Sequence, residues 1–135
     1  MIVSTRGRYA LHVMLHLAAQ HGGGYIPLKE IADAEEISQK YLASIMAVLS
    51  RAGLVDAIQG KGGGYRLSRA PETYTVGSIL KLTEGSLAAV SCTSGSGRCE
   101  KADCCKTLPM WEKLDGLIDG FLESITLNDL MYSTK

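Results

Sequence analysis

Residues 38–67 read SQKYLASIMAVLSRAGLVDAIQGKGGGYRL and contain the elements that decide the fold. Ser38 is a strong N-cap for a helix that runs to about Arg51, and Gly53 supplies its C-terminal stop. An apolar stripe with helical spacing marks the inward face of this helix: Leu42, Ile45 and Leu49. Small and polar residues form the opposite face, which is therefore expected to point outward: Gln39, Lys40, Ala43, Ser44 and Ala47.

A β-hairpin is predicted directly after this helix. Its strands are expected at about Leu54–Gln59 and Tyr65–Leu67, and residues 60–64 read GKGGG between them. The high glycine content leaves Lys61 as almost the only side chain at the hairpin tip. The sequence therefore predicts a slim hairpin whose backbone can approach another surface closely.

Two more helices are predicted upstream. Ser4 or Thr5 caps the first, which runs to about Gln20, and Pro27 opens a short second helix. Residues 34–37 then form a turn into the helix that Ser38 caps. Two short helices joined by a tight turn and followed by a hairpin form a winged helix-turn-helix.

Downstream, Thr75 is expected to cap a helix to about Glu84, and a long helix is expected from Leu108 or Pro109 to Ile125. Apolar residues at 3-4-3-4 spacing predict a coiled-coil-like seam: Trp111, Leu114, Ile118, Phe121 and Ile125. The fold class is thus mainly α with a small β-wing. Three parts are expected: a winged helix-turn-helix DNA-binding domain at 1–84, a cysteine-containing cofactor loop at 85–107, and a dimerisation helix with a C-terminal tail at 108–135.

The charge distribution favours a nucleic-acid partner. The chain has 135 residues and no net charge, but residues 1–70 carry eight Lys and Arg against five acids. A basic half suits contact with DNA phosphates. Neither a signal peptide nor a membrane-spanning stretch is expected, so the location should be cytoplasmic. The sequence offers no nucleophile–base–acid constellation, and we do not expect an enzyme.

Side chains in the first turn of the Ser38 helix could read double-stranded DNA. Gln39 and Lys40 can hydrogen-bond to base edges, and Ser38 with the unpaired backbone N–H groups of that turn can hold a phosphate. Lys61 at the hairpin tip could contact a phosphate or the minor groove. The competing interpretation is that the helices and the hairpin serve only packing.

All four cysteines lie between positions 92 and 105, in a segment rich in glycine, serine and charge. Thiolates are soft ligands, and Cys92, Cys99 and Cys105 could converge on an iron–sulfur cluster of the 2Fe-2S or 4Fe-4S type. The fourth ligand stays open among Cys104, Asp103 or Glu100, and a group from another subunit. A zinc site that uses all four thiolates, a reversible thiol switch and an inert loop are the alternatives.

Several strings together resemble the Rrf-type family of bacterial winged-helix transcription regulators, and within it the iron–sulfur cluster-binding branch. They are TRGRYAL at 5–11, YL at 41–42, AGLV at 52–55, GGGY at 62–65, Trp111 and ITL at 125–127. The resemblance covers nearly the whole chain. It implies a homodimer whose last long helices cross at the two-fold axis and which binds palindromic operators.

The resemblance also implies site residues. The recognition-helix contacts fall on Ser38, Gln39, Lys40 and Tyr41, the wing contacts on Gln59, Lys61, Gly63 and Tyr65, and the iron ligands on Cys92, Cys99 and Cys105. Cys104 is a further candidate ligand. The chain departs from the branch at three positions: Gln59 replaces a wing arginine, Ala43 replaces an acidic residue, and Leu108 replaces a histidine ligand.

These features predict a transcription regulator that senses iron–sulfur or redox status through a cysteine-ligated cluster. The alternative is a repressor of the same fold that responds to thiol oxidation or to a metabolite without a cluster. A small electron carrier is a third hypothesis, which the helix-turn-helix and the basic half disfavour.

Overall fold

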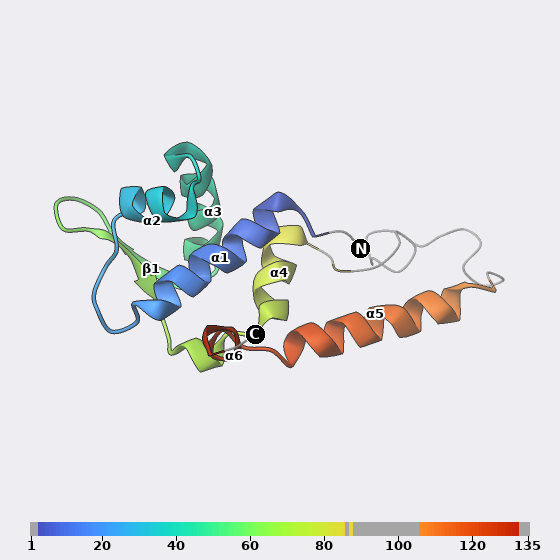
Figure 1. Ribbon diagram of the computed structural model, residues 1–135. Helices are drawn as coiled ribbons and strands as arrows, with labels where there is room; N and C mark the ends of the chain where they lie inside the picture. The colour runs from blue at the N-terminus through green and yellow to red at the C-terminus, as the bar shows by residue number, and fades with distance from the viewer. Residues whose placement is uncertain (1–2, 86, 88–105, 133–135) are drawn as a thin grey trace.

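The computed structural model describes residues 3–85, 87 and 106–132. Figure 1 shows helices α1 (Thr5–Ala19), α2 (Leu28–Glu35) and α3 (Gln39–Arg51), then the hairpin of β1 (Val55–Ile58) and β2 (Gly64–Leu67). A short 3-10 turn η1 (Pro71–Thr73), α4 (Val76–Glu84), α5 (Leu108–Glu123) and α6 (Leu127–Met131) complete the described chain. The predicted fold class, mainly α with a small β-wing, is confirmed. None of these helices has the length and apolar character that a membrane crossing requires.

Helix starts follow the capping residues that the sequence offers. The side chains of Ser4, Ser38 and Thr75 each accept a hydrogen bond from the third backbone N–H of the helix that follows. Thr126 caps α6 and, with Asp129, forms a reciprocal capping box. Local hydrogen bonding therefore fixes where α1, α3, α4 and α6 begin.

The core is built around α1, which lies in the middle of the molecule (Figure 1) and packs against α2, α4, α6 and β2. Its buried residues, together with the half-buried Tyr9, Leu11 and Leu15, occupy much of its circumference, as expected for a helix covered on several sides. The main fully buried side chains are Val13, Met14, Leu17, Ile31, Leu42, Ile45, Met46, Leu49, Tyr74, Ile79 and Leu127.

The wing is braced by a contact that the sequence did not reveal. β1 and β2 pair antiparallel, with Val55 opposite Leu67. Ile26 and Tyr65 form an additional bridge in which each backbone N–H donates to the other residue's carbonyl at 2.8 Å. Gly64 has a φ of +152°, and a Cβ there would overlap the Ile26 carbonyl. Glycine at this position thus permits the loop before α2 to pack against the wing.

Tyr74 ties the base of the wing to the rest of the fold. Its side chain is fully buried, and its hydroxyl donates to the Leu54 carbonyl at 2.7 Å. The same oxygen accepts from the backbone N–H of Ser68 at 3.1 Å and of Arg69 at 3.0 Å. The Tyr74 carbonyl accepts from Leu127 N–H at 3.0 Å. One residue therefore joins the start of β1, the end of β2 and α6.

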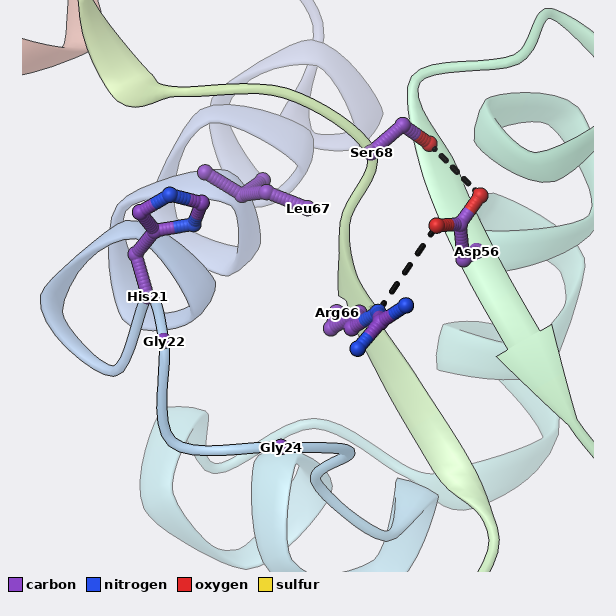
Figure 2. Close-up of a pocket in the computed structure, with 7 residues that line it drawn as sticks. All are labelled: His21, Gly22, Gly24, Asp56, Arg66, Leu67 and Ser68. Carbon is purple, nitrogen blue, oxygen red and sulfur yellow. Dashed lines mark hydrogen bonds and ion pairs between the residues drawn. The ribbon is translucent and has the colours of Figure 1, made fainter.

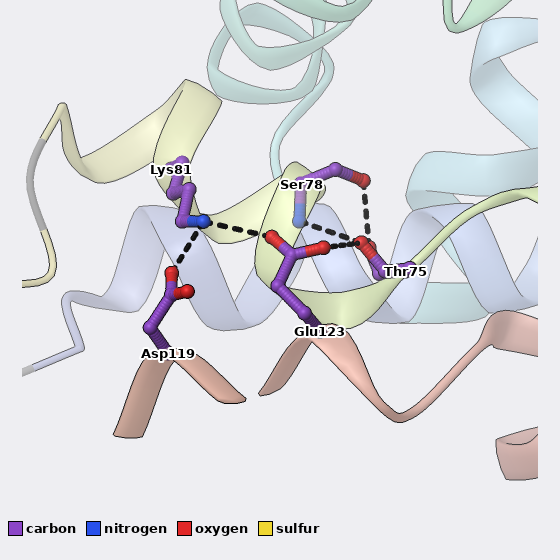
Figure 3. A network of polar contacts seen from close by, with 5 residues as sticks. All are labelled: Thr75, Ser78, Lys81, Asp119 and Glu123. Atoms are coloured by element: carbon purple, nitrogen blue, oxygen red, sulfur yellow. Dashed lines mark hydrogen bonds and ion pairs between the residues drawn. The ribbon is translucent and has the colours of Figure 1, made fainter. Parts of the chain in front are cut away.

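A polar clasp joins α5 to α4 (Figure 3). Lys81 forms ion pairs with Asp119 and, at 2.8 Å, with Glu123. The other carboxylate oxygen of Glu123 accepts from the Thr75 hydroxyl at 2.8 Å. Gly77 leaves space for this carboxylate, since a Cβ there would lie 2.5 Å from it. Backbone pairing continues the connection, because Val76 N–H donates to the Ile125 carbonyl at 2.8 Å.

The exposed face of α5 differs from the predicted seam. The large apolar side chains exposed on this helix are Met110, Leu114, Leu117 and Phe121, and no α5 residue is buried. The expected seam was wrong about Ile125, which packs beside the buried Val76, Leu80 and Leu87. Leu122 of α5 packs beside the same cluster, and sequence spacing alone could not show that Leu122 and Ile125 face α4.

We expect Tyr74→Phe to destabilise the fold. The substitution removes the hydroxyl that satisfies Leu54, Ser68 and Arg69, and a loss of about 1–3 kcal/mol in the free energy of unfolding is expected. Urea denaturation measures this. Tyr132→Phe is the matched control, because Tyr132 is 72% exposed, and its midpoint should equal that of the wild type. Equal stability of both variants would contradict the anchoring role.

The clasp predicts a pH dependence of stability. Hydrogen bonds from Lys81 and Thr75 lower the pKa of Glu123 below its ordinary value of 4.5. A lowered carboxyl pKa contributes stability that is present above the unfolded pKa and is lost as pH falls through the folded one. Hydrogen bonds to Asp119 and Glu123 raise the pKa of Lys81 above 10.5, so its contribution is lost only in strong alkali.

Glu123→Gln should therefore cost about 0.2–1 kcal/mol at neutral pH, because the pair is partly exposed. The difference from the wild type should shrink below about pH 4.5, which chemical denaturation at several pH values measures. Glu112→Gln, an exposed change on the same helix, serves as the control. A difference that stays constant into acid would rule out the ion pair as its source.

Candidate nucleic-acid interface

The first turn of α3 presents its polar side chains to the surface. The Ser38 hydroxyl accepts from Tyr41 N–H at 3.1 Å, which fixes the start of the helix. Gln39 and Lys40 are exposed in this turn. The outer face continues with exposed small residues: Ala43, Ser44 and Ala47. A helix with such a slim outer face can enter the major groove of DNA.

Tyr41 is only partly exposed, because its ring packs against Tyr9 of α1. The two ring centroids lie 5.9 Å apart at an interplanar angle of 76°, an edge-to-face contact. Part of the Tyr41 ring therefore holds α3 against α1. Its predicted role in DNA contact stays a prediction.

Arg6 extends this surface and was missed as a site residue. Its guanidinium donates to the carbonyl of Ser44 at 3.3 Å, which places a cation from the first turn of α1 beside the middle of α3. The neighbouring Arg8 is exposed. The basic string at positions 5–8 was the available signal, but sequence alone could not place it next to α3.

The predicted wing residues fall into two groups. Gln59 and Lys61 are exposed at the tip, where they could reach a duplex. Gly63 and Tyr65 are half-buried, and a Cβ at Gly63 would overlap the Ile58 carbonyl. Tyr65 pairs with Ile26 through the bridge described above. Gly63 and Tyr65 thus shape the wing, whereas Gln59 and Lys61 supply its side chains.

A pocket of about 210 Å³ at the base of the wing has its charges already paired (Figure 2). Asp56 accepts from the Ser68 hydroxyl at 2.9 Å and pairs with the Arg66 guanidinium at 3.7 Å. That guanidinium also lies 4.5 Å from the centroid of the Tyr25 ring. These contacts brace β1, β2 and the α1–α2 loop, and they give little basis for a ligand site.

The proposed iron ligands lie outside the described residues: Cys92, Cys99, Cys105 and the further candidate Cys104. Within residues 3–85, 87 and 106–132, no three His, Cys, Asp or Glu side chains come together as a metal site. Leu108 is the first residue of α5, and its hydrocarbon side chain has no donor atom for a metal. Leu108 therefore cannot act as a metal ligand.

Comparisons with known proteins identify the family of this chain. The Rrf2 family model, described as an iron-dependent transcriptional regulator, matches residues 3–133. The chain is 35% identical to the HTH-type transcriptional regulator IscR of Escherichia coli, over 97% of this chain and 80% of that protein.

Two solved structures are also similar. CymR (YrzC), the global cysteine regulator of B. subtilis, gives a TM-score of 0.80 at 34% identity, covering 100% of this chain and 99% of that one. T. potens IscR gives a TM-score of 0.77 at 37% identity, covering 97% and 86% respectively. The predicted resemblance is confirmed.

Lys40→Ala and Lys61→Ala should each weaken DNA binding. For Lys40, loss of a base contact should cost about 1–3 kcal/mol and relax sequence preference. For Lys61, loss of a phosphate contact should reduce the slope of log affinity against log salt by about one unit. Fluorescence anisotropy with a duplex selected from a random library measures both effects. Glu72→Gln, an exposed change in η1 away from α3, the wing and α5, is the control and should bind as the wild type does. Wild-type affinity in both lysine variants would show that this face does not bind DNA.

Proposed function

The chain belongs to the Rrf2 family of transcriptional regulators, and on that premise we propose that it controls transcription in response to an iron–sulfur cluster. Family membership makes it a DNA-binding regulator and not an enzyme. The finer features are our proposal: cluster or redox sensing, palindromic operators, a homodimeric state and a cytoplasmic location. The exposed, slim outer face of α3 is the observation that carries the DNA-binding part of this proposal.

In the proposed complex the first turn of α3 lies in the major groove. Gln39 and Lys40 contact base edges, while Ser38 and the N-terminal backbone amides of α3 hold a phosphate. Lys61 at the wing tip contacts the backbone or the minor groove. Tyr41 and Gln59 contribute at the rim of this surface, and Gly63 and Tyr65 maintain the shape of the wing.

The homodimer is proposed from the exposed face of α5. Leu117 and Phe121 are each 63% exposed, and Met110 and Leu114 continue the same stripe. An apolar stripe of this kind suits a partner helix. A Cβ at Gly116 or Gly120 would meet no atom within 4 Å, so close approach of a second backbone is sterically open there. A homodimer would present two copies of α3, and these could bind two DNA half-sites that lie one helical turn apart.

The cluster is proposed from the chemistry of the donor set. Cys92, Cys99 and Cys105 supply three thiolates, the ligand type that holds iron–sulfur clusters. A bound cluster of the 2Fe-2S or 4Fe-4S type would supply a group whose redox state or loss can be sensed. The absence of a ligand atom at Leu108 leaves the fourth position to Cys104, Asp103 or Glu100, or to the other subunit. This division assigns residues 1–84 to DNA binding, 85–107 to the cofactor and 108–135 to dimerisation.

A second candidate is a repressor of the same fold without a cluster, in which the thiols or a metabolite carry the signal. The similarity over the full chain to CymR, described as a global cysteine regulator, supports it. In that case oxidation would join two of the four thiols reversibly. Metal analysis separates the two candidates.

Protein purified without oxygen should be brown and contain iron and acid-labile sulfide. Cys92→Ser should lose both, because it removes a thiolate ligand. Ser94→Ala, a change in the same segment that removes no thiolate, is the control and should keep both. Stoichiometric zinc, or metal-free protein after reconstitution with iron and sulfide, would overturn the cluster in favour of zinc or thiol chemistry.

Phe121→Glu should convert the dimer into a monomer by placing a charge in the apolar seam. Sedimentation equilibrium measures the mass. Glu112→Lys also changes a charge on α5, but at an exposed position off the stripe, and this control should remain dimeric. A monomeric wild-type protein, or a dimeric Phe121→Glu variant, would reject α5 as the dimer contact.

A further inference from the structure

The last residue of α4 is held against the first turn of α1. The Ser4 backbone N–H and the Ser4 hydroxyl donate to the same oxygen of Glu84, at 2.9 and 2.8 Å. The Ser4 oxygen in turn accepts from Gly7 N–H at 3.2 Å. A carboxylate at a helix N-terminus is stabilised by the helix dipole and the unpaired N–H groups. Glu84 therefore anchors the start of α1 across 80 positions of sequence.

The space for this carboxylate is provided by Gly7. Gly7 is buried, and a Cβ there would overlap the Glu84 oxygen and lie 3.2 Å from the Val3 side chain. Any residue larger than glycine would displace the carboxylate or the first turn of α1. The contact thus depends on three residues that fit one another: Ser4, Gly7 and Glu84.

The same turn of α1 also touches α3. Arg6 lies between Ser4 and Gly7 and donates to the Ser44 carbonyl at 3.3 Å. Ser44 belongs to the exposed outer face of α3. A single helical turn therefore contacts Glu84 through Ser4 and α3 through Arg6.

We propose that Glu84 is a positioning residue for DNA binding, which acts through Ser4 and Arg6 on the placement of α3. The inference rests on the proposed role of α3 in reading DNA. Glu84 is followed by Gly85, and the sequence then continues into the residues that carry the cysteines. Glu84 therefore lies near one of the two described ends of the segment that carries the cysteines, and the start of α5 lies near the other.

A double-mutant cycle on DNA affinity tests this role. The probe is a fluorescent duplex selected from a random library by the wild-type protein. Glu84→Gln keeps the shape of the side chain but removes its charge. It should weaken binding about fivefold to tenfold in the wild type and by less than about twofold in an Arg6→Ala background, since coupled residues are not additive.

A Lys40→Ala background provides the contrast. Lys40 makes no contact with Glu84 or Arg6 among the hydrogen bonds of the described residues, so Glu84→Gln should weaken binding there by the same factor as in the wild type. Glu72→Gln, an exposed change in η1, should leave affinity unchanged. Gly7→Ala is a second test, because the added Cβ displaces the Glu84 carboxylate. It should weaken DNA binding in the wild type and should do so by a smaller factor in the Arg6→Ala background.

Equal factors for Glu84→Gln in the wild-type and Arg6→Ala backgrounds would overturn the inference, as would unchanged affinity in Glu84→Gln itself. In both cases, weaker DNA binding by the Lys40→Ala variant would still support the proposed DNA-binding face. If Lys40→Ala and Arg6→Ala both bind as tightly as the wild type, the inference and the DNA face fail together. Thermal unfolding of each variant confirms that the affinities are compared between folded proteins.

Discussion

The structure depends on the hydrogen bonds that the buried Tyr74 makes. Its buried hydroxyl forms hydrogen bonds with three backbone groups at the base of the wing, one before β1 and two after β2. Its backbone carbonyl accepts a hydrogen bond from the first residue of α6. A buried phenol with all its hydrogen bonds made is both rigid and specific, because each unsatisfied partner would cost free energy. The wing and the C-terminal helices are thereby fixed to one frame, although they lie far apart in sequence.

This frame matters because a dimer can bind DNA only if its two recognition helices are held at the spacing of the two half-sites. The α4–α5 clasp around Lys81 and Glu123 connects α5 to the domain that carries α3. If α5 forms the dimer contact, the distance between two copies of α3 is set through this clasp. A small movement at the start of α1 or the end of α4 would then change how both helices meet the duplex.

Local sequence rules predicted much of this fold. Capping residues such as Ser38 and Thr75, the stop at Gly53 and the glycine-rich tip near Lys61 gave the elements nearly as the structure has them. Long-range contacts were not predictable, because spacing carries no information about partners far along the chain. The Ile26–Tyr65 bridge, the contact of Arg6 with α3 and the packing of Ile125 inward are of this kind. The cysteine ligands were inferred from donor chemistry and resemblance, and they lie outside the described residues.

We propose that the state of the cysteine ligands and the affinity for DNA are linked. The most direct measurement compares the equilibrium dissociation constant for one selected duplex before and after removal of the cluster by a chelator, without oxygen and at the same salt concentration. Linkage requires the cluster to favour one arrangement of the dimer, so the two constants should differ by about fivefold to 150-fold. Equal constants for the loaded and the stripped dimer would contradict the account.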